Sequence, residues 1–260
     1  MSSDEQAKAH SRARFSQYAQ GYVTSDTHSR GSDLDRLLEV AAPQPDWVGV
    51  DIATGGGHTA LKVAPFVKRM IATDYAPTML DSARDFITSK GVSNVDYIPA
   101  DAENLPFSDS SVDLVTCRIA AHHFPDIFKF VRESARILKQ GGRLVVQDHL
   151  LPDDKQAAAY IEAFETLRDP SHVRALDEYE WRGDFLDADL TVDHVEKLAR
   201  HAKMLPWAER QGCTPDVIER LHILMVQAPQ PVAEWMNIQC AGTADASFDH
   251  VYILIAGTKR

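Results

Sequence analysis

The sequence predicts an α/β protein whose doubly wound, mostly parallel, seven-stranded sheet has helices on both faces. An apolar run at residues 48–52 is followed by a glycine cluster and an apolar-periodic segment, which is the pattern of a buried strand, a tight loop and a helix. Strand-like and helix-like segments then alternate up to residue 148, as in parallel strands joined by right-handed crossovers. Acidic residues close several strands, at the sheet edge where such folds bind ligands.

Each segment can be assigned in chain order. An N-terminal helix and loop with scattered aromatics precede a helix at 31–42, which Pro43 ends. The next strands are predicted at 48–52, 69–73, 95–98, 112–117 and 143–148, with helices at 58–65, 77–90 and 126–138. Beyond residue 150, the periodicity predicts helices at 155–168, 172–181 and 215–226, a helix or irregular segment at 230–239, and strands at about 190–197 and 251–256.

Composition excludes several classes of protein. The 260 residues are 44% hydrophobic, enough for one sizeable domain with or without a lid. The net charge of -11 argues against a nucleic-acid partner, which needs a basic face. We expect a cytoplasmic protein, because the N-terminus lacks the apolar core of a signal peptide and no apolar run is long enough to span a membrane. The three scattered cysteines predict free thiols, and no spacing of His, Cys and carboxylates predicts a metal site.

The glycine loop is open to two interpretations. Its spacing, Gly55-x-Gly57-x-x-Ala60, also fits a dinucleotide-binding fingerprint. A dinucleotide would bring two phosphate charges, yet Asp51 precedes the loop and the next basic residue is Lys62. Three further acids close later apolar runs: Asp74, Asp101 and Asp148. An acid-lined crevice favours a cationic cofactor without phosphates, such as S-adenosylmethionine, because carboxylates can bind its ammonium, sulfonium and ribose hydroxyls.

Five motifs, in order and correctly spaced, resemble those of the class I S-adenosylmethionine-dependent methyltransferases. They are the glycine loop, Asp74, Asp101-Ala102 followed by Leu105-Pro106-Phe107, Asp113-Leu114-Val115, and Leu138-Lys139-x-Gly141-Gly142. Within this family, the chain is most similar to the ubiquinone and menaquinone C-methyltransferases and to small-molecule methyltransferases. One departure is Ala53, which stands where the family usually has its first glycine. A methyl group fits there if the backbone φ angle is negative.

The resemblance implies one domain with three parts. Residues 1–30 form an N-terminal cap segment, and residues 31–150 form the core that binds S-adenosylmethionine. Residues 151–260 supply two cap insertions, 151–170 and 204–245, together with the final pair of strands. We expect the insertions to cover the crevice and the last strand to run antiparallel at the sheet edge.

The resemblance also implies roles for the strand-end acids. Asp74 would accept both ribose hydroxyls, with a helix cap as the alternative. Asp101 and Ala102 would clamp the adenine, with a simple turn acid as the alternative for Asp101, while Glu103 is expected to face solvent. Asp51 needs a partner, because burying a lone carboxylate is costly. The predicted cofactor-binding residues are Tyr22, His28, Asp51, Ala53, Thr54, Gly55, Gly57, Asp74, Tyr75, Met79, Asp101, Ala102 and Arg118.

The loop after the fourth strand holds the best acid–base candidates, His122 and His123. From Arg118 to His123 it is similar to the Arg-x-x-x-x-His run of phosphoethanolamine methyltransferases, in which the corresponding histidine works with an N-terminal tyrosine. That resemblance implies a catalytic His123 paired with Tyr18 or Tyr22. The alternative is a histidine that only bonds the backbone at a helix start.

Other residues are candidates for an acceptor site. Asp148-His149 is a second possible base pair, or else a strand-ending acid beside an exposed histidine. In the cap, the polar and aromatic candidates are His172, His201, Trp207, Arg210 and Trp235. Each of these cap residues has an ordinary place on a helix surface or in a core as its alternative.

We therefore expect in-line methyl transfer from S-adenosylmethionine to carbon, oxygen or nitrogen of a small organic acceptor, giving S-adenosylhomocysteine. Alignment with the activated sulfonium can supply much of the rate, so a base is needed only if the acceptor loses a proton. One alternative is an NAD-dependent oxidoreductase, which Asp51 and the lack of a Tyr-x-x-x-Lys pair disfavour. Another is a cyclase, isomerase or regulator that binds the cofactor without transferring methyl. We expect a monomer or homodimer.

Overall fold

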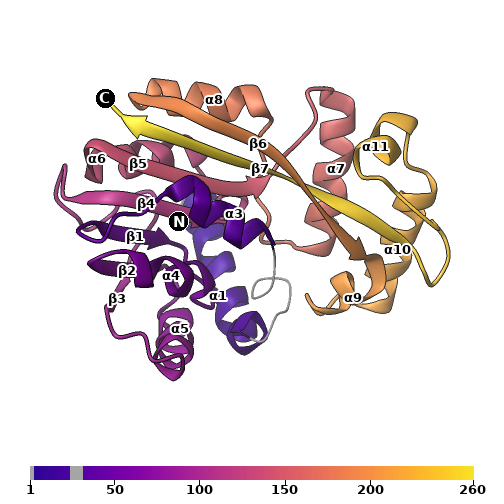
Figure 1. Ribbon diagram of the computed structural model, residues 1–260. Helices are drawn as coiled ribbons and strands as arrows, with labels where there is room; N and C mark the ends of the chain where they lie inside the picture. The colour runs from indigo at the N-terminus through magenta and orange to yellow at the C-terminus, as the bar shows by residue number, and fades with distance from the viewer. Residues whose placement is uncertain (1–2, 24–31) are drawn as a thin grey trace.

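One seven-stranded sheet organises the computed structural model, which describes residues 3–23 and 32–260 (Figure 1). The strands are β1 (Val48–Ile52), β2 (Arg69–Asp74), β3 (Val95–Pro99), β4 (Val112–Arg118), β5 (Leu138–His149), β6 (Leu190–Lys203) and β7 (Ser247–Lys259). Their order is β3-β2-β1-β4-β5-β7-β6. Neighbouring strands from β3 to β5 pair in parallel, whereas β7 is antiparallel to both β5 and β6. The predicted α/β fold is confirmed, including its antiparallel final strand.

The helices lie in front of, behind and beyond this sheet. They are α1 (Ser3–Val23), α3 (Ser32–Ala41), α4 (His58–Val63), α5 (Pro77–Ser89), α6 (Ile127–Ile137), α7 (Lys155–Arg168), α8 (Glu178–Asp187), α9 (Met204–Glu209), α10 (Pro215–Val226) and α11 (Gln230–Trp235). Short 3-10 helices span Ala64–Phe66 and Ala121–His123. Within the described ranges, no helix has both the length and the apolar character needed to cross a membrane.

Alternation along the strands builds a hydrophobic layer on each face of the sheet. In β4, Val115 and Cys117 pack into the layer that α6 and α8 cover with residues such as Phe130 and Trp181. Leu114 points the other way, into the layer under α3, α4 and α5. Successive side chains of a strand point to opposite faces, so a run of apolar residues fills both layers at once.

A third core lies beyond the end of β5, in a helical cap formed by α7, α9, α10 and α11. Buried residues of these helices, including Trp207 and Leu221, gather around Phe248 near the start of β7. β7 pairs with β6 from Ser247 to Lys259 but with β5 only from Tyr252 onward. The β6–β7 ribbon therefore projects past β5 and carries the cap (Figure 1).

The main error in the predicted elements is the helix at 172–181. Helix α8 instead begins at Glu178, because Asp177 and Glu180 form a capping box in which each side chain accepts from the other's backbone N–H. The residues before it are held outside a helix, since the N–H groups of Val173 and Arg174 donate to the carbonyl of residue 122. The last two strands also prove longer than predicted, reaching residue 203 in β6 and starting at residue 247 in β7.

Candidate functional site

A pocket of about 1050 Å³, open to solvent, lies at the carboxyl ends of β1 to β4. Most of the predicted site residues line it: Asp51, Ala53, Thr54, Gly55, Asp74, Tyr75, Met79, Asp101, Ala102, Arg118 and His123. Gly57 and His122 are absent from that lining. His28 lies outside the described residues, and so do the side chains of Tyr18 and Tyr22, although their backbone belongs to α1.

The glycine loop turns sharply in the left-handed region of backbone conformation. Ala53, Gly55 and Gly57 have φ angles of 51°, 54° and 83°. The condition of a negative φ at Ala53 is therefore not met, and its methyl group sits in a conformation that costs an L-residue roughly 1–2 kcal/mol. Gly57 serves packing, because a Cβ there would come within 2.9 Å of Ile87 Cδ1 on α5.

Asp51 is buried at the end of β1 and finds its partners in two hydroxyl groups. Thr54 Oγ1 donates to one carboxylate oxygen at 2.6 Å and Thr116 Oγ1 donates to the other at 2.7 Å. Burial raises the pKa of Asp51 to about 6, while the two hydroxyl bonds oppose that shift. The sequence analysis expected a partner for Asp51 but did not identify these two threonines.

Asp74 holds the glycine loop and the start of α5 at the end of β2. Its oxygens accept the N–H groups of Gly55 at 3.0 Å and Ala76 at 2.9 Å. Ala76, not Asp74, occupies the N-cap position of α5. Burial raises the pKa of Asp74 to about 6, against the effect of these backbone donors.

Helix α1 brings cations to the pocket. Lys8 Nζ lies 2.7 Å from Asp101 and 2.8 Å from Glu103, and Arg12 stacks over the ring of Tyr75 at 5.8 Å. The prediction that Glu103 faces solvent is wrong, since it is buried and its second oxygen accepts the backbone N–H of residue 126. Sequence reasoning missed Lys8 and Arg12, although their spacing of four residues places them on one helix face.

The same helix reaches the cap further along. Arg14 lies 3.0 Å from Asp169 and donates to the carbonyl of Gln211 at 3.0 Å. Helix α1 thus contacts the pocket through Lys8 and the cap through Arg14. Among the described residues that line the pocket, none comes from the insertions 151–170 or 204–245, which were expected to cover the crevice.

His123 faces the pocket from the loop after β4. Its Nδ1 lies 2.9 Å from the carbonyl oxygen of Ser171. Because a carbonyl only accepts hydrogen bonds, Nδ1 carries the proton and Nε2 carries the lone pair of the neutral ring. Burial lowers the pKa of His123 and so favours that neutral form.

His122 lies behind His123 and is tied to Asp148. Its Nδ1 is 2.5 Å from Asp148 Oδ1, and its backbone N–H donates to Asp148 Oδ2 at 3.1 Å. Asp148 therefore pairs with His122 and not with the side chain of His149. The alternative of an exposed His149 is wrong, because the ring of His149 packs with its centroid 4.4 Å from that of His122.

The residues of the cap that were candidates for an acceptor site lie outside the strand-end pocket. His172 is buried beside Glu162, with Nε2 3.0 Å from the carboxylate. The side chain of His201 is 59% exposed, whereas Trp207 is buried in the core of the cap. None of the five candidates in the cap lines the strand-end pocket: His172, His201, Trp207, Arg210 and Trp235.

Comparisons with known proteins identify the family. Residues 50–146 match the family model described as a methyltransferase domain. The uncharacterised methyltransferase YcgJ of Bacillus subtilis is 38% identical to this chain over 247 residues, which are 95% of this chain and 98% of YcgJ. The crystal structure of YcgJ matches with a TM-score of 0.85 and 35% sequence identity, covering 88% of this chain and 98% of the YcgJ chain. A demethylmenaquinone methyltransferase of Thermotoga maritima is 36% identical over 141 residues, 54% of this chain and 58% of its own. The chain belongs to the class I S-adenosylmethionine-dependent methyltransferases.

Proposed function

We propose that this chain binds S-adenosylmethionine in the strand-end pocket and transfers its methyl group to a small organic acceptor by in-line displacement. The observation that carries this proposal is the convergence of three carboxylates, Asp51, Asp74 and Asp101, with the glycine loop in one pocket. The acceptor atom forms a bond to the methyl carbon as the carbon–sulfur bond breaks, so the configuration at that carbon inverts and S-adenosylhomocysteine leaves.

The residues present fit the cofactor. The oxygens of Asp74 accept the backbone N–H groups of Gly55 and Ala76, and the backbone of Tyr75 also hydrogen-bonds to them. A carboxylate offers about four acceptor positions in all, so Asp74 keeps acceptor capacity toward the ribose. Asp101, with Ala102 beside it in the lining, would accept from the adenine amino group.

Three cations in the lining bear on the choice between this cofactor and a dinucleotide. The sequence argument counted only the basic residues near the glycine loop, and Lys8, Arg12 and Arg118 come from elsewhere in the chain. Two of them already have carboxylate partners, since Lys8 pairs with Asp101 and Arg118 lies 2.8 Å from Asp33. Their charge is largely neutralised within the protein, which supports a cofactor without phosphates.

His123 is our candidate for a general base when the acceptor must lose a proton. The Ser171 carbonyl fixes the tautomer in which Nε2 can accept that proton. His122 packs with its ring centroid 4.1 Å from that of His123 and is anchored by Asp148. We assign His122 to positioning the catalytic ring, because it does not line the pocket.

A calorimetric titration with S-adenosylmethionine, S-adenosylhomocysteine and NAD at matched concentrations tests the cofactor. We expect micromolar binding of the first two and none of NAD. Labelled S-adenosylmethionine then allows a screen of small acceptors, with transfer of the label as the readout. Binding of NAD alone would overturn the proposal.

The pH dependence of binding is a second test. Asp74 has a pKa of about 6 in the unliganded protein, so it loses its charge as the pH falls through that value. Since the hydroxyls of the cofactor donate to the ionised carboxylate, we expect the affinity to drop about tenfold between about pH 7.5 and about pH 5. Titrations in matched buffers measure this change, and Asp74→Asn should reduce it, leaving the part that comes from Asp51. An unchanged affinity at the lower pH would contradict the role of Asp74.

A further inference from the structure

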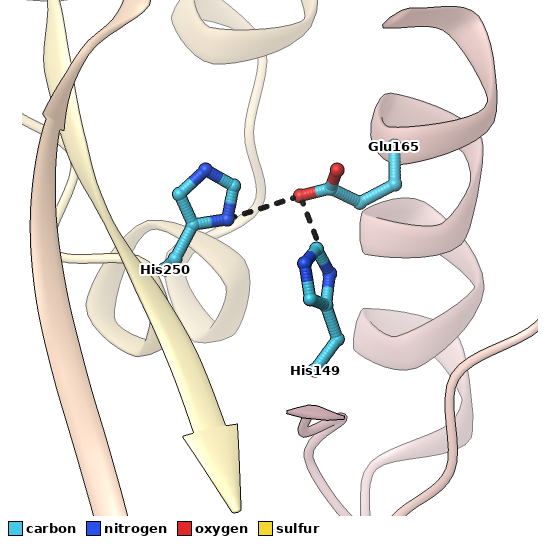
Figure 2. A group of neighbouring side chains, drawn as sticks. All are labelled: His149, Glu165 and His250. Atoms are coloured by element: carbon cyan, nitrogen blue, oxygen red, sulfur yellow. Dashed lines mark ion pairs between the residues drawn. The ribbon is translucent and has the colours of Figure 1, made fainter. Parts of the chain in front are cut away.

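Three potential metal ligands from distant parts of the chain meet between the sheet and the cap. His149 ends β5, Glu165 lies on α7 and His250 lies on β7. In the antiparallel register His149 stands opposite Tyr252, two residues from His250, so the two histidines project to the same side of the sheet. Figure 2 shows both rings directed at the carboxylate of Glu165.

The distances among the three side chains suit a metal ion. Nδ1 of His250 lies 3.4 Å and Nδ1 of His149 lies 4.0 Å from the same oxygen of Glu165, and one ligand atom from each residue fits within 4.8 Å of the others. Ligands bound tetrahedrally to zinc at about 2.0–2.1 Å stand roughly 3.4 Å apart. A small side-chain movement would therefore bring all three within bonding distance of one ion.

The ligand atoms of these three side chains are not taken up by hydrogen bonds to other described residues. Glu165 is only 4% exposed, yet within the described part of the chain no hydrogen bond reaches its carboxylate or the ring nitrogens of His149 and His250. The neighbouring buried histidines are each engaged, His122 by Asp148 and His172 by Glu162. A buried carboxylate without a hydrogen bond is costly, and a bound cation would reduce that cost.

The trio also borders open space. A pocket of about 330 Å³, which includes open solvent at its mouth, is lined by all three residues and by apolar neighbours such as Leu151 and Trp235. Three protein ligands beside an open volume resemble catalytic metal sites, which keep a coordination position for water or a ligand. Two imidazoles and one carboxylate favour first-row transition metals over magnesium or calcium, which prefer oxygen ligands.

We propose that His149, Glu165 and His250 bind one divalent transition-metal ion of the zinc type, with its remaining coordination positions facing the pocket beside the cap. The sequence analysis predicted no metal site, because the three ligands belong to three separate elements and so show no characteristic spacing along the chain. The site lies apart from the strand-end pocket, with His122 and His123 between them. It does not depend on the identity of the methyl acceptor.

Titration of chelator-treated protein with Co²⁺ tests this site, because cobalt in such an environment absorbs visible light. We expect saturation at about one ion per chain, displacement by Zn²⁺, and no displacement by Mg²⁺. Glu165→Gln and His250→Gln should each weaken Co²⁺ binding by about 100-fold. His172→Gln, in the same histidine cluster, and His194→Gln, on the sheet edge, serve as matched controls and should bind like the wild type.

Several outcomes would overturn the site: no cobalt band in the wild type, unchanged binding in both ligand variants, or equal loss in the two controls. Circular dichroism and S-adenosylmethionine titration of every variant separate loss of the metal from loss of the fold. Because cofactor binding is read independently, a protein that binds S-adenosylmethionine but not Co²⁺ refutes only the metal site. The reverse result refutes only the proposed cofactor.

Discussion

Replacement of Asp74 by alanine is expected to weaken S-adenosylmethionine binding by about 100-fold. The variant would lose the acceptor for two ribose hydroxyls, and hydrogen bonds to a charged group contribute roughly 1.5–3 kcal/mol each. It would also release the N–H groups of Gly55 and Ala76, which the carboxylate holds in place. Calorimetric titration of the purified variant measures the change in affinity.

Two companion variants separate charge from general effects on the fold. Asp74→Asn keeps the size and some hydrogen-bonding capacity, so we expect an intermediate loss. Asp96→Ala removes an exposed carboxylate on β3 that pairs with Arg69 at the surface, and its affinity should match the wild type. Wild-type affinity in Asp74→Ala would refute the ribose assignment.

Substitution of Thr116 by valine is expected to lower the free energy of unfolding by about 2 kcal/mol. The change is nearly isosteric but removes a donor to a carboxylate that is 1% exposed. Since burial already raises the pKa of Asp51 to about 6, loss of the donor should raise it further. The destabilisation should therefore be larger at about pH 8, where Asp51 is ionised, than at about pH 5.

Urea denaturation at the two pH values measures this effect. Thr88→Val on the exposed surface of α5 provides the control and should change stability by less than about 0.5 kcal/mol. A Thr116→Val protein as stable as the wild type at both pH values would show that Thr116 does not support the charge on Asp51.

The part of the fold that the sequence predicts well is the part controlled by local patterns. β1 matches its predicted bounds, and the strand-end acids lie at one edge because parallel strands bring their carboxyl ends together. The helix predicted at 172–181 failed because a capping box at Asp177 and contacts with the loop at residue 122 outweigh a local apolar pattern.

The errors within the site have the same origin. Burial of Glu103 depends on Lys8 and on the backbone of residue 126, which no local pattern reveals. One of the two partners of Asp51 lies 65 residues away at Thr116. The positive φ of Ala53 depends on the path of the whole loop. Such features follow from tertiary contacts, so a single sequence predicts the type of site better than its internal bonding.

Helix α1 connects the strand-end pocket with the cap. Lys8 binds Asp101 on the sheet side, and Arg14, less than two turns further along, binds Asp169 and Gln211 on the cap side. A ligand that takes the place of Lys8 on Asp101 changes the free energy with which the whole helix is held. Linkage is reciprocal, so occupancy of the pocket would alter the anchoring of the cap, and any substrate that tightens the cap would alter cofactor affinity by the same factor.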